Sequence, residues 1–494
     1  MKKHTIFKLL AVILCFIMLA SLFAACTKKD DGQTTTAKDT TSAPETDSLY
    51  DENGFLLDSL PSDLKYNNRD FTLFTWSNQT VWEWSKEQQS GDLIKDSLYL
   101  RMLNVEERLG IKIIIEERAG EWENRQSFIQ ALEANVLTQS GAYDLVGQYT
   151  ASAGIGTMKK LYTDLKEVDY LDLEKPWWPA DISANCTVDG KLYFMTGDIT
   201  PTLIRSMGTI MANLEMAENL GIQSEELYNL VYDRKWTMEK LQQLALGKTE
   251  GYNPDATPAY GFTFHDNVVF DNMFYGGGFK FIENDEQGNL ALSDSINSER
   301  MVDWYTACQK FLFNNPDVSL NTIEKAFTVG NSIFHLCIVA NVQNYMTQVD
   351  FDFAILPTPL IDEDQEDYAT VNGMWVTYYS IPEDALEFSF SGAVTEALAS
   401  DGYRRTTPTF YEQAFQLRYL QTEENSKMFD ILHNTLVFDT VRCFADEVKS
   451  GSASLFSSFR SAGSNSSSSW TTIYNANAEV WEATILNIVN KMGS

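Results

Sequence analysis

The sequence predicts an α/β protein whose chain crosses between two lobes, and two observations support this prediction. Short apolar runs alternate with helical patterns between Phe71 and Val146, which is typical of a parallel sheet covered by helices. Further along, a mostly apolar strand, Phe351–Leu356, ends at Pro357-Thr358-Pro359. The prolines remove backbone donors and keep their neighbours extended, so the strand cannot continue as a central one. This exit suits a crossing between lobes, and an ordinary strand end explains it equally well.

The first part of the chain justifies the parallel sheet element by element. Apolar residues at helical spacing predict two helices, one from Ile94 to Leu109 and one around Phe128–Val136. Gly110 is well placed to end the first helix. Short apolar runs predict the strands, which are Phe71–Trp76, Ile111–Ile115 and Asp144–Val146.

Ligands of parallel α/β sheets bind outside the carboxyl ends of the strands. This rule places Trp76–Asn78 and Gln148–Ser152 at one shared rim of the predicted sheet. The later chain continues as strands and helices, with a turn at Asp189-Gly190. The predicted elements include a strand Lys191–Met195, a strand end at Ile210–Asn213, a helix Glu215–Leu220, a helix capped by Thr237, a strand Tyr260–Phe264 and a final amphipathic helix over Trp481–Met492.

The amino terminus is typical of a targeting segment. Basic Lys2, Lys3 and Lys8 precede an apolar run that ends in Ala24-Ala25-Cys26. This end resembles a bacterial lipobox, in which the Cys is lipidated after cleavage, except that Phe23 stands where Leu is usual. An uncleaved anchor helix is the alternative, because the run is nearly long enough to span a bilayer. We therefore expect a signal peptide over 1–25 and a lipidated Cys26.

Residues 27–48 are rich in Thr, Asp, Lys and Ser and contain almost no apolar residue, so they cannot bury enough surface to fold. We expect residues 26–65 to form a flexible tether between the lipid and the folded body.

Composition excludes one class of partner. The formal net charge of -32 argues against nucleic acid, because phosphates need Lys and Arg to neutralise them.

Beyond the signal segment the spacing of the cysteines matches no metal motif. We predict that these cysteines are buried thiols, with one long-range disulfide among them as the alternative. They are Cys186, Cys308, Cys337 and Cys443.

Catalytic and cofactor motifs are weak. The three histidines beyond the signal segment have no partner three or four residues away, so nothing suggests zinc; they are His265, His335 and His433. Gly247-Lys248-Thr249 resembles the end of a phosphate loop, but Gln242 stands where its first Gly is needed. The acidic turn at 362–367 has Asp367 where a calcium loop needs Gly. We predict no catalytic residue, metal or cofactor. A pair of carboxylates for glycoside hydrolysis stays an alternative, because the chain has 69 acidic residues.

Several aromatic residues at predicted strand ends stand beside planar polar ones. A sugar presents an apolar ring face and a rim of hydroxyls, and this combination satisfies both. For each aromatic residue a place in the core is an equal alternative. The pairs are Trp76 with Asn78, Tyr149 with Gln148, Tyr275 with Asn272, and Trp375 with Asn372. Gly276–Gly278 would let a ligand approach Gly277 closely, or would make a sharp bend.

These features together resemble the extracellular solute-binding proteins of family 1, the lipoproteins of bacterial sugar-uptake ABC transporters. Besides the lipobox and tether, the resemblance involves segments along nearly the whole chain. They are Tyr143–Val146, Leu171–Leu173 with Pro176–Trp178, Gly190–Tyr193 with Gly197-Asp198, Trp236-Thr237, Gly276–Gly278, Phe327–Gly330 followed by Ala354–Pro359, and Thr407-Pro408 with Tyr411-Glu412.

The resemblance implies a periplasmic-binding-protein-like fold with two discontinuous α/β lobes, a hinge and a ligand cleft. It implies a first lobe of residues 66–200 plus 351–402 and a helix-rich second lobe of 201–350 plus 403–494. Asp198 would lie near the first crossing, with Asn272–Gly277 and Trp375 lining the cleft. The protein would be a non-enzymatic monomer, lipid-anchored outside the cell membrane, that passes a sugar or oligosaccharide to a permease.

Two other classes of function remain open at this stage. One is a surface carbohydrate-active enzyme, which would release product from a polysaccharide. The other is a sensor ectodomain that signals ligand status to a membrane kinase. The predicted cleft would also suit a peptide or an aromatic-bearing solute.

Overall fold

A computed structural model describes residues 49–85, 90–250, 258–264, 269–285, 288–313, 315–320, 323–345, 349–416, 423–445 and 469–493. The predicted signal peptide, Cys26 and the tether as far as residue 48 lie outside the described residues, as does His265. The tether was expected to continue to residue 65, but Leu60 is buried and Asp58 pairs with Arg108, so this part of the chain packs on the folded body. Residues 50–494 form one compact unit that contains two separate main sheets. Among the described helices, none combines the length and apolar character needed to cross a bilayer.

The first sheet has the strand order β12-β3-β1-β2. β1 is parallel to both β2 and β3, which confirms the parallel arrangement predicted from the alternation of strands and helices. β12 adds an antiparallel edge beside β3. The strands are β1 (Arg69–Trp76), β2 (Ile111–Arg118), β3 (Leu145–Tyr149) and β12 (Thr377–Ser380), and the helices that follow β1 and β2 are α2 (Ser77–Glu83), α3 (Leu93–Leu109) and α4 (Arg125–Leu137).

Helix α3 shows why this sequence folds as predicted. The Asp92 carboxylate caps its first turn by accepting hydrogen bonds from the backbone N–H groups of Ile94 and Lys95, at 3.0 and 3.2 Å. Gly110 ends the helix in the left-handed conformation with φ 60°, as expected for a glycine at this position. The apolar stripe along the helix is buried at Leu98, Val105 and Leu109.

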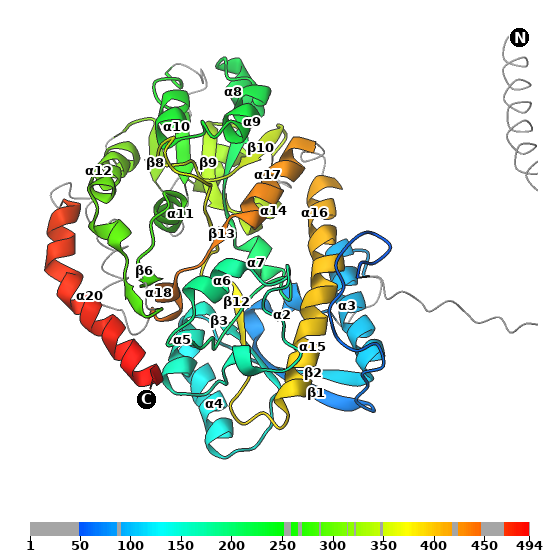
Figure 1. The fold of residues 1–494 in the computed structure, drawn as a ribbon. Coiled ribbons are helices and arrows are strands. Elements are labelled where there is room, and N and C mark those ends of the chain that lie inside the picture. Colours follow the sequence, from blue (N-terminus) through cyan, green and yellow to red (C-terminus); the bar gives the residue numbers. More distant parts are fainter. Residues whose placement is uncertain are drawn as a thin grey trace, which may run out of the picture. The chain divides into compact units, whose positions relative to one another are not determined.

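The second sheet is mixed, with the order β10-β4-β9-β5-β8. β5 runs parallel to β8 and β9, whereas β4 runs antiparallel to β9 and β10. In Figure 1 these strands lie among the green and yellow-green elements, apart from the first sheet. The strands are β4 (Gly208–Asn213), β5 (Tyr260–Phe264), β8 (Val318–Leu320), β9 (Ser332–Ile338) and β10 (Phe353–Leu356).

Strand β10 corrects one part of the predicted lobes, because residues 351–402 were expected in the first lobe. β10 pairs with β4 in the second sheet, where Phe353 faces Asn213. The chain returns to the first sheet only at β12. The proline-rich exit at Pro357–Pro359 therefore does begin a crossing between the sheets, but the strand before it belongs to the second sheet.

A second boundary also differs from the prediction. The proposed break between residues 402 and 403 falls inside an unbroken helical segment. This segment consists of α15 (Phe388–Asp401), a π-helical stretch Gly402–Thr406 and α16 (Thr407–Gln416). α15 and α16 both contact α3 of the first sheet, and α16 also contacts α17.

The remaining described elements surround the two sheets. The predicted strand Lys191–Met195 forms only bridges, from Val188 to Lys191 and from Met195 to Tyr379. The helices are α5 (Thr150–Met158), α6 (Ala180–Asn185), α7 (Thr202–Arg205), α8 (Leu214–Asn219), α9 (Ser224–Tyr232), α10 (Met238–Ala245), α11 (Val269–Gly276), α12 (Glu299–Phe313), α13 (Ile323–Thr328), α14 (Val339–Tyr345), α17 (Glu423–Asn434), α18 (Thr440–Cys443) and α20 (Trp470–Gly493), with short 3-10 turns at Leu165–Glu167 and Asp294–Asn297. Short strand pairs are formed by β6 (Ile282–Asn284) with β7 (Leu290–Leu292), and by β11 (Thr370–Val371) with β13 (Leu436–Val437).

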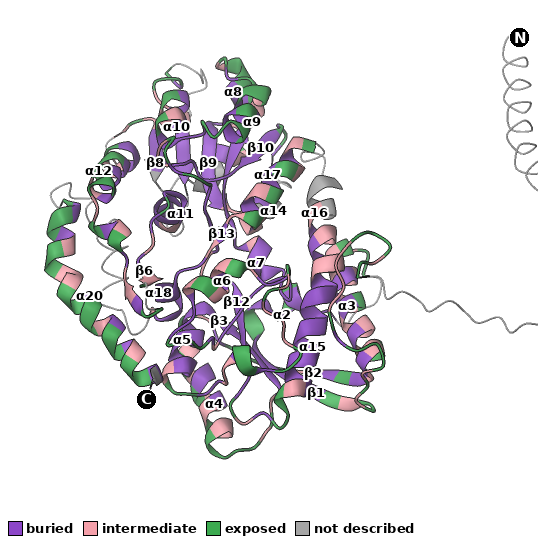
Figure 2. Cartoon of the chain, viewed as in Figure 1, coloured by how far each residue is buried: buried purple, intermediate pink, exposed green. Residues whose placement is uncertain are grey.

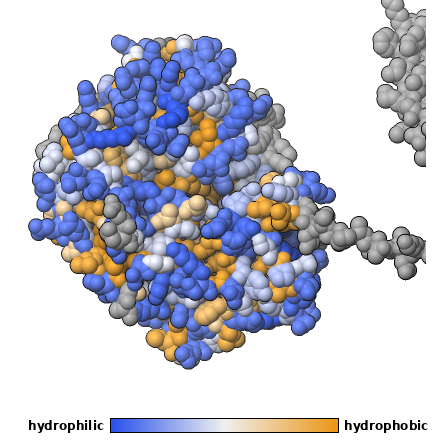
Figure 3. Space-filling view, viewed as in Figure 1, coloured by the Kyte–Doolittle hydropathy of each residue, from blue (hydrophilic) through white to orange (hydrophobic). Residues whose placement is uncertain are grey.

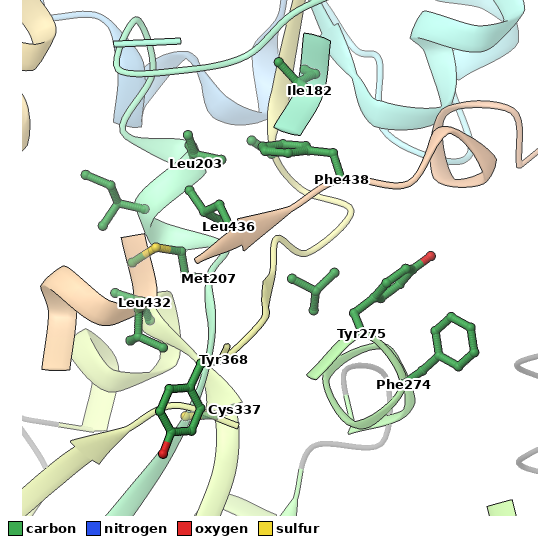
Figure 4. Close-up of a cluster of buried hydrophobic side chains, with 14 of the residues drawn as sticks. Ile182, Leu203, Met207, Phe274, Tyr275, Cys337, Tyr368, Leu432, Leu436 and Phe438 are labelled. Carbon is green, nitrogen blue, oxygen red and sulfur yellow. The ribbon is translucent and has the colours of Figure 1, made fainter. Parts of the chain in front are cut away.

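The buried core is continuous between the two sheets. Its largest cluster includes residues of both sheets and of the segments that connect them. Figure 4 shows this junction, where Ile182 of α6 and Leu203 of α7 lie near Leu436 and Phe438 around β13. Strands β3, β4, β9, β10 and β12 are buried almost throughout, whereas the edge strand β2 becomes exposed towards its carboxyl end (Figure 2). The predicted buried thiols are confirmed, because Cys186, Cys308, Cys337 and Cys443 are all buried and unpaired. The face drawn in Figure 3 is mainly hydrophilic, with smaller hydrophobic areas between the hydrophilic ones.

Candidate functional site

Three aromatic side chains meet at one edge of the first sheet. Trp76 is the last residue of β1, and Tyr149 is the last residue of β3. Because β1 and β3 are parallel neighbours, their carboxyl ends lie side by side. The ring centroids of Trp76 and Tyr149 are 5.4 Å apart, and the Trp375 ring stacks on Trp76 at 5.9 Å. The structure thus brings together three residues predicted to bind ligand, and we call Trp76, Tyr149 and Trp375 the aromatic cluster.

Trp375 is the accessible member of this cluster. Its side chain is 49% exposed, whereas Trp76 is 0% exposed. Two hydrogen bonds hold the segment that carries Trp375. The Thr150 hydroxyl donates to the Met374 carbonyl oxygen at 2.9 Å, and the Trp76 indole N–H donates to the Thr377 hydroxyl at 2.8 Å. A ligand at this edge would therefore meet a positioned, half-exposed indole supported by a buried one.

An ion pair lies next to the aromatic cluster. The Arg442 guanidinium of α18 contacts the Asp271 carboxylate of α11 at 2.6 Å and donates to the Asn372 carbonyl oxygen at 2.8 Å. It also lies 5.5 Å from the ring centroid of Tyr275. Burial alone would lower the pKa of Arg442, but the nearby Asp271 carboxylate outweighs burial and raises it. Arg442 is therefore a cation whose charge is already balanced.

The same ion pair influences the titration of Tyr149 in the aromatic cluster. Burial raises the pKa of Tyr149 to about 12, while Arg442 acts to lower it and Asp271 acts to raise it. The segment that carries Trp375 also carries Asn372, whose carbonyl oxygen accepts the hydrogen bond from Arg442 at 2.8 Å. The site therefore combines aromatic faces from the first sheet with a balanced ion pair from α11 and α18.

Asn78 lies close to the cluster on α2. Its side chain is exposed, and its Oδ1 accepts a hydrogen bond from the Gly120 backbone N–H at 3.3 Å. Gly120 itself packs closely on the cluster, because a Cβ added there would lie 2.8 Å from the Trp76 Cβ. The predicted pairing of Trp76 with an exposed amide is therefore present in the structure.

Gln148 has different surroundings from those predicted. Its side chain is fully buried in β3 and forms hydrogen bonds at both ends of the amide. The amide nitrogen donates to the Ser380 hydroxyl at 3.0 Å, and the amide oxygen accepts from the Tyr162 hydroxyl at 2.5 Å. Successive side chains of a strand point to opposite faces, so Gln148 does not share the face of Tyr149. Its contacts connect β3 to its neighbours and leave no exposed polar group for a ligand.

The three residues predicted around α11 are all buried. The Tyr275 hydroxyl donates to the Asp439 carboxylate at 3.2 Å, and burial raises the pKa of Tyr275 far above its ordinary value. Asn272 packs against Gly208 of β4, where an added Cβ would lie 1.4 Å from the Asn272 Oδ1. Gly277 packs against Phe279. Tyr275 adjoins the ion pair through Arg442, while Asn272 and Gly277 have contacts with the surrounding second-sheet elements.

Asp198 lies at a different place. Its Oδ1 accepts a hydrogen bond from the Thr407 hydroxyl at 2.7 Å and lies 3.6 Å from the His433 Nε2. Neither Thr407 nor His433 belongs to the aromatic cluster. Asp198 and His433 line a cavity of about 800 Å³ together with Trp178 and Tyr368. The structure therefore does not bring Asp198 to the other predicted ligand residues.

The Asp198–His433 contact predicts a pH-dependent stability. Burial would lower the pKa of His433, but Asp198, helped by Asn434 and Asp430, outweighs burial and raises it. A raised pKa stabilises the fold fully below the ordinary value of about 6.5, and the stabilisation disappears as pH rises through the raised value. We expect His433→Gln to lower the melting temperature at pH 5.5 and to have little effect at pH 9. An equal loss at both pH values would contradict this explanation, and Asp198→Asn should reproduce the same pH profile.

Sequence reasoning missed the ion pair of Arg442 with Asp271 and a second contact, which joins α2 to α7. Asp271 is a polar residue within an apolar run, and no local pattern pairs it with Arg442, because the two lie 171 residues apart. The other missed pair is Trp82 of α2, which is 41% exposed, and Arg205 of α7, whose guanidinium lies 3.7 Å above the Trp82 ring centroid. Burial lowers the pKa of Arg205 to about 10. Within the described ranges, no group of three or more His, Cys, Asp or Glu side chains could hold a metal ion.

Comparison with known proteins defines the fold. No protein-family model and no curated protein matches the chain. Among solved structures, UgpB from Mycobacterium tuberculosis in complex with glycerophosphocholine is similar with a TM-score of 0.55 and 12% identity, covering 87% of this chain and 100% of that one. The galacto-N-biose-/lacto-N-biose I-binding protein of the ABC transporter from Bifidobacterium longum, in complex with lacto-N-biose, has a TM-score of 0.51 and 11% identity, covering 86% and 98%. A cyclo/maltodextrin-binding protein complexed with maltotetraose has a TM-score of 0.50 and 14% identity, covering 87% and 98%.

These similarities span nearly the full length of both chains. The protein therefore has the two-lobe α/β fold of the solute-binding proteins of ABC transporters. The resemblance predicted from the sequence is confirmed at the level of the fold.

Proposed function

We propose that this protein is a lipid-anchored extracellular solute-binding protein that captures a sugar or oligosaccharide between its lobes and delivers it to the permease of an ABC transporter. The observation that supports this proposal best is the aromatic cluster, in which half-exposed Trp375 stacks on buried Trp76 beside polar groups of α11 and α18. An indole face suits the apolar face of a sugar ring, and neighbouring polar groups suit its hydroxyls. Two of the similar structures are complexes with sugars, one with maltotetraose and one with lacto-N-biose.

The charges of the site favour an uncharged ligand. Arg442 is paired with Asp271 at 2.6 Å, so binding an anion there would require breaking a largely buried ion pair. A cation would face the same competition for Asp271. A neutral, hydroxyl-rich ligand can instead accept and donate hydrogen bonds at the rim while the pair stays intact.

The same contacts argue for capture rather than catalysis. Hydrolysis of a glycosidic bond normally uses two carboxyl groups that act as acid and as base or nucleophile. Asp271 is neutralised by Arg442, and Asp439 accepts hydrogen bonds from the Phe281 and Val441 backbone N–H groups and from the Tyr275 hydroxyl. These two carboxylates beside Arg442 and Tyr275 are therefore engaged in structural contacts.

Isothermal titration calorimetry tests the proposed ligand class directly. We expect saturable binding of a neutral oligosaccharide, with maltotetraose and lacto-N-biose as the first probes and glycerophosphocholine as the charged comparison. Chromatography of the same mixtures should recover the ligand unchanged. Release of smaller sugars would identify an enzyme instead, and binding of glycerophosphocholine alone would contradict a neutral sugar ligand.

The anchor is a separate part of this proposal and has its own test. We expect wild-type protein expressed in a bacterial host to incorporate labelled palmitate and to remain with the membrane fraction. Cys26→Ser should incorporate no label, because a lipobox is lipidated through its cysteine thiol and serine has none. Equal labelling of Cys26→Ser would remove the lipid anchor from the proposal without affecting ligand capture.

A further inference from the structure

Glu83, the last residue of α2, is a fully buried carboxylate with an unusual set of partners. Its Oε1 accepts hydrogen bonds from the Thr200 hydroxyl at 2.5 Å and from the Thr202 hydroxyl at 3.0 Å. Its Oε2 accepts from the Tyr379 hydroxyl at 3.4 Å. Each of these hydroxyls is itself almost completely buried. The carboxylate is therefore held by donors from segments far from α2 in the sequence.

These donors belong to the two segments that connect the sheets. Thr200 and Thr202 lie on the first connection, between Met195, which bridges to β12, and β4 of the second sheet. Tyr379 lies in β12, where the second connection enters the first sheet. The two connections are also joined directly, because the Thr377 backbone N–H donates to the Thr202 hydroxyl at 3.0 Å. A single side chain thus contacts both of the segments that join strands of one sheet to strands of the other.

Arg101 of α3 completes this arrangement, which we call the Glu83 network (Glu83, Arg101, Thr200, Thr202 and Tyr379). Its guanidinium donates to the Glu83 carbonyl oxygen at 2.6 Å and also to the carbonyl oxygen of Ile199. Arg101 is 0% exposed. A buried guanidinium and a buried carboxylate are stable only when their hydrogen bonds are largely satisfied. The network therefore favours one relative position of α2, α3 and the first connection.

The Glu83 network also adjoins the candidate ligand site. Thr377, which donates to Thr202, accepts the hydrogen bond of the Trp76 indole at 2.8 Å. On the other side, Trp82 precedes Glu83 in α2 and lies under the guanidinium of Arg205, which ends the helix that begins at Thr202. A movement of either connection would therefore be transmitted to the aromatic cluster and to the exposed ring of Trp82.

We infer that Glu83 is a positioning residue for ligand capture, which holds both connections against α2 and so determines the separations that the two lobes adopt. This role rests on the proposed capture of ligand by lobe closure. Hydrophobic residues could fill the same volume, but only an acceptor with two oxygens can bind hydroxyls from both connections at once. The inference is specific to these hydroxyl donors and can be tested without knowing the natural ligand.

The experiment measures the distance between spin labels on the two lobes by electron–electron double resonance. Labels are placed on cysteines introduced at exposed Ala134 of α4 and exposed Gln243 of α10, since the four native cysteines of the folded body are buried. Thr202→Val removes the central hydroxyl of the network, and Glu83→Gln replaces one acceptor oxygen by an amide NH2 group, which cannot accept a hydrogen bond. Thr157→Val is the matched control, because this buried hydroxyl donates only to the Ala153 carbonyl oxygen within its own helix.

Without ligand, we expect a broader and shifted distance distribution for Thr202→Val and Glu83→Gln than for the wild type and Thr157→Val. Thr202→Ser, which keeps the hydroxyl, should restore the wild-type distribution. Affinity for maltotetraose, if the wild type binds it, should change by ~5-fold or more in Thr202→Val, as expected for coupling between a hinge and a binding site.

Superimposable distributions for all five proteins would overturn the role of Glu83, even if maltotetraose binds well. Absence of any ligand binding, with the distributions changed as expected, would instead refute the proposed function and leave the control of lobe separation intact. Thermal melting of Thr202→Val and Thr157→Val separates this effect from a general loss of stability. If Thr202→Val fails to fold, the comparison of Glu83→Gln with the wild type decides the question.

Discussion

Trp375→Ala should weaken the binding of a neutral oligosaccharide by ~30-fold, which corresponds to about 2 kcal/mol for a central aromatic contact. Trp375 is 49% exposed and stacks on Trp76 at 5.9 Å, so its outer face is the one that a ligand can contact. Trp76 cannot replace it, because the Thr377 hydrogen bond holds the Trp76 indole in the core. Titration calorimetry of the variant and the wild type with the same oligosaccharide measures the loss.

Tyr232→Ala provides a matched control for this loss. Tyr232 of α9 is a similarly exposed aromatic residue, at 40%, but its hydroxyl contacts Glu424 of α17 and it is not among the residues of the site. Its removal should leave the affinity unchanged. Wild-type affinity in Trp375→Ala would show that the aromatic cluster is not the ligand surface, and this result would withdraw the main support for the proposed sugar ligand.

The aromatic cluster was partly predictable from the sequence, and the reason is geometric. Alternating strands and helices imply parallel strands, and parallel neighbours bring their carboxyl ends together. That rule alone placed Trp76 and Tyr149 at one edge, where the structure has their ring centroids 5.4 Å apart. It could not distinguish Tyr149 from Gln148. Successive side chains of a strand point to opposite faces, so Gln148 and Tyr149 cannot both face the ligand. This pattern alone could have removed Gln148 from the predicted site.

The polar half of the site could not be predicted in this way. Arg442 and Asp271 lie 171 residues apart, and nothing local in either segment indicates that α11 and α18 meet. The same limit explains the misplaced strand β10. Its apolar residues and the prolines after it correctly predict a buried strand that stops, but pairing with Asn213 of β4 is a property of the second sheet as a whole. Local patterns identify elements, whereas contacts between distant elements depend on the complete fold.

Arg442→Met should lower the free energy of unfolding by about 3 kcal/mol, the lower end of the range for breaking a buried ion pair. Arg442 is 5% exposed, and its loss would leave both the Asp271 carboxylate and the Asn372 carbonyl oxygen without their donor. Asp271 keeps 19% of its side-chain surface exposed, which limits the cost because water can solvate part of the charge. Urea denaturation of the variant and the wild type measures the difference.

Two further variants separate the effect of burial from the loss of an arginine. Arg300→Met removes the partner of Asp362 at 2.8 Å, but these side chains are 43% and 45% exposed, so the loss should stay below about 1 kcal/mol. Adding Asp271→Asn to Arg442→Met should recover part of the stability, because the unpaired charge is removed. Equal losses for Arg442→Met and Arg300→Met would mean that the pair beside the aromatic cluster is solvated like a surface pair. The argument for a neutral ligand would then lose its basis, since Arg442 would be available to bind an anion at little cost.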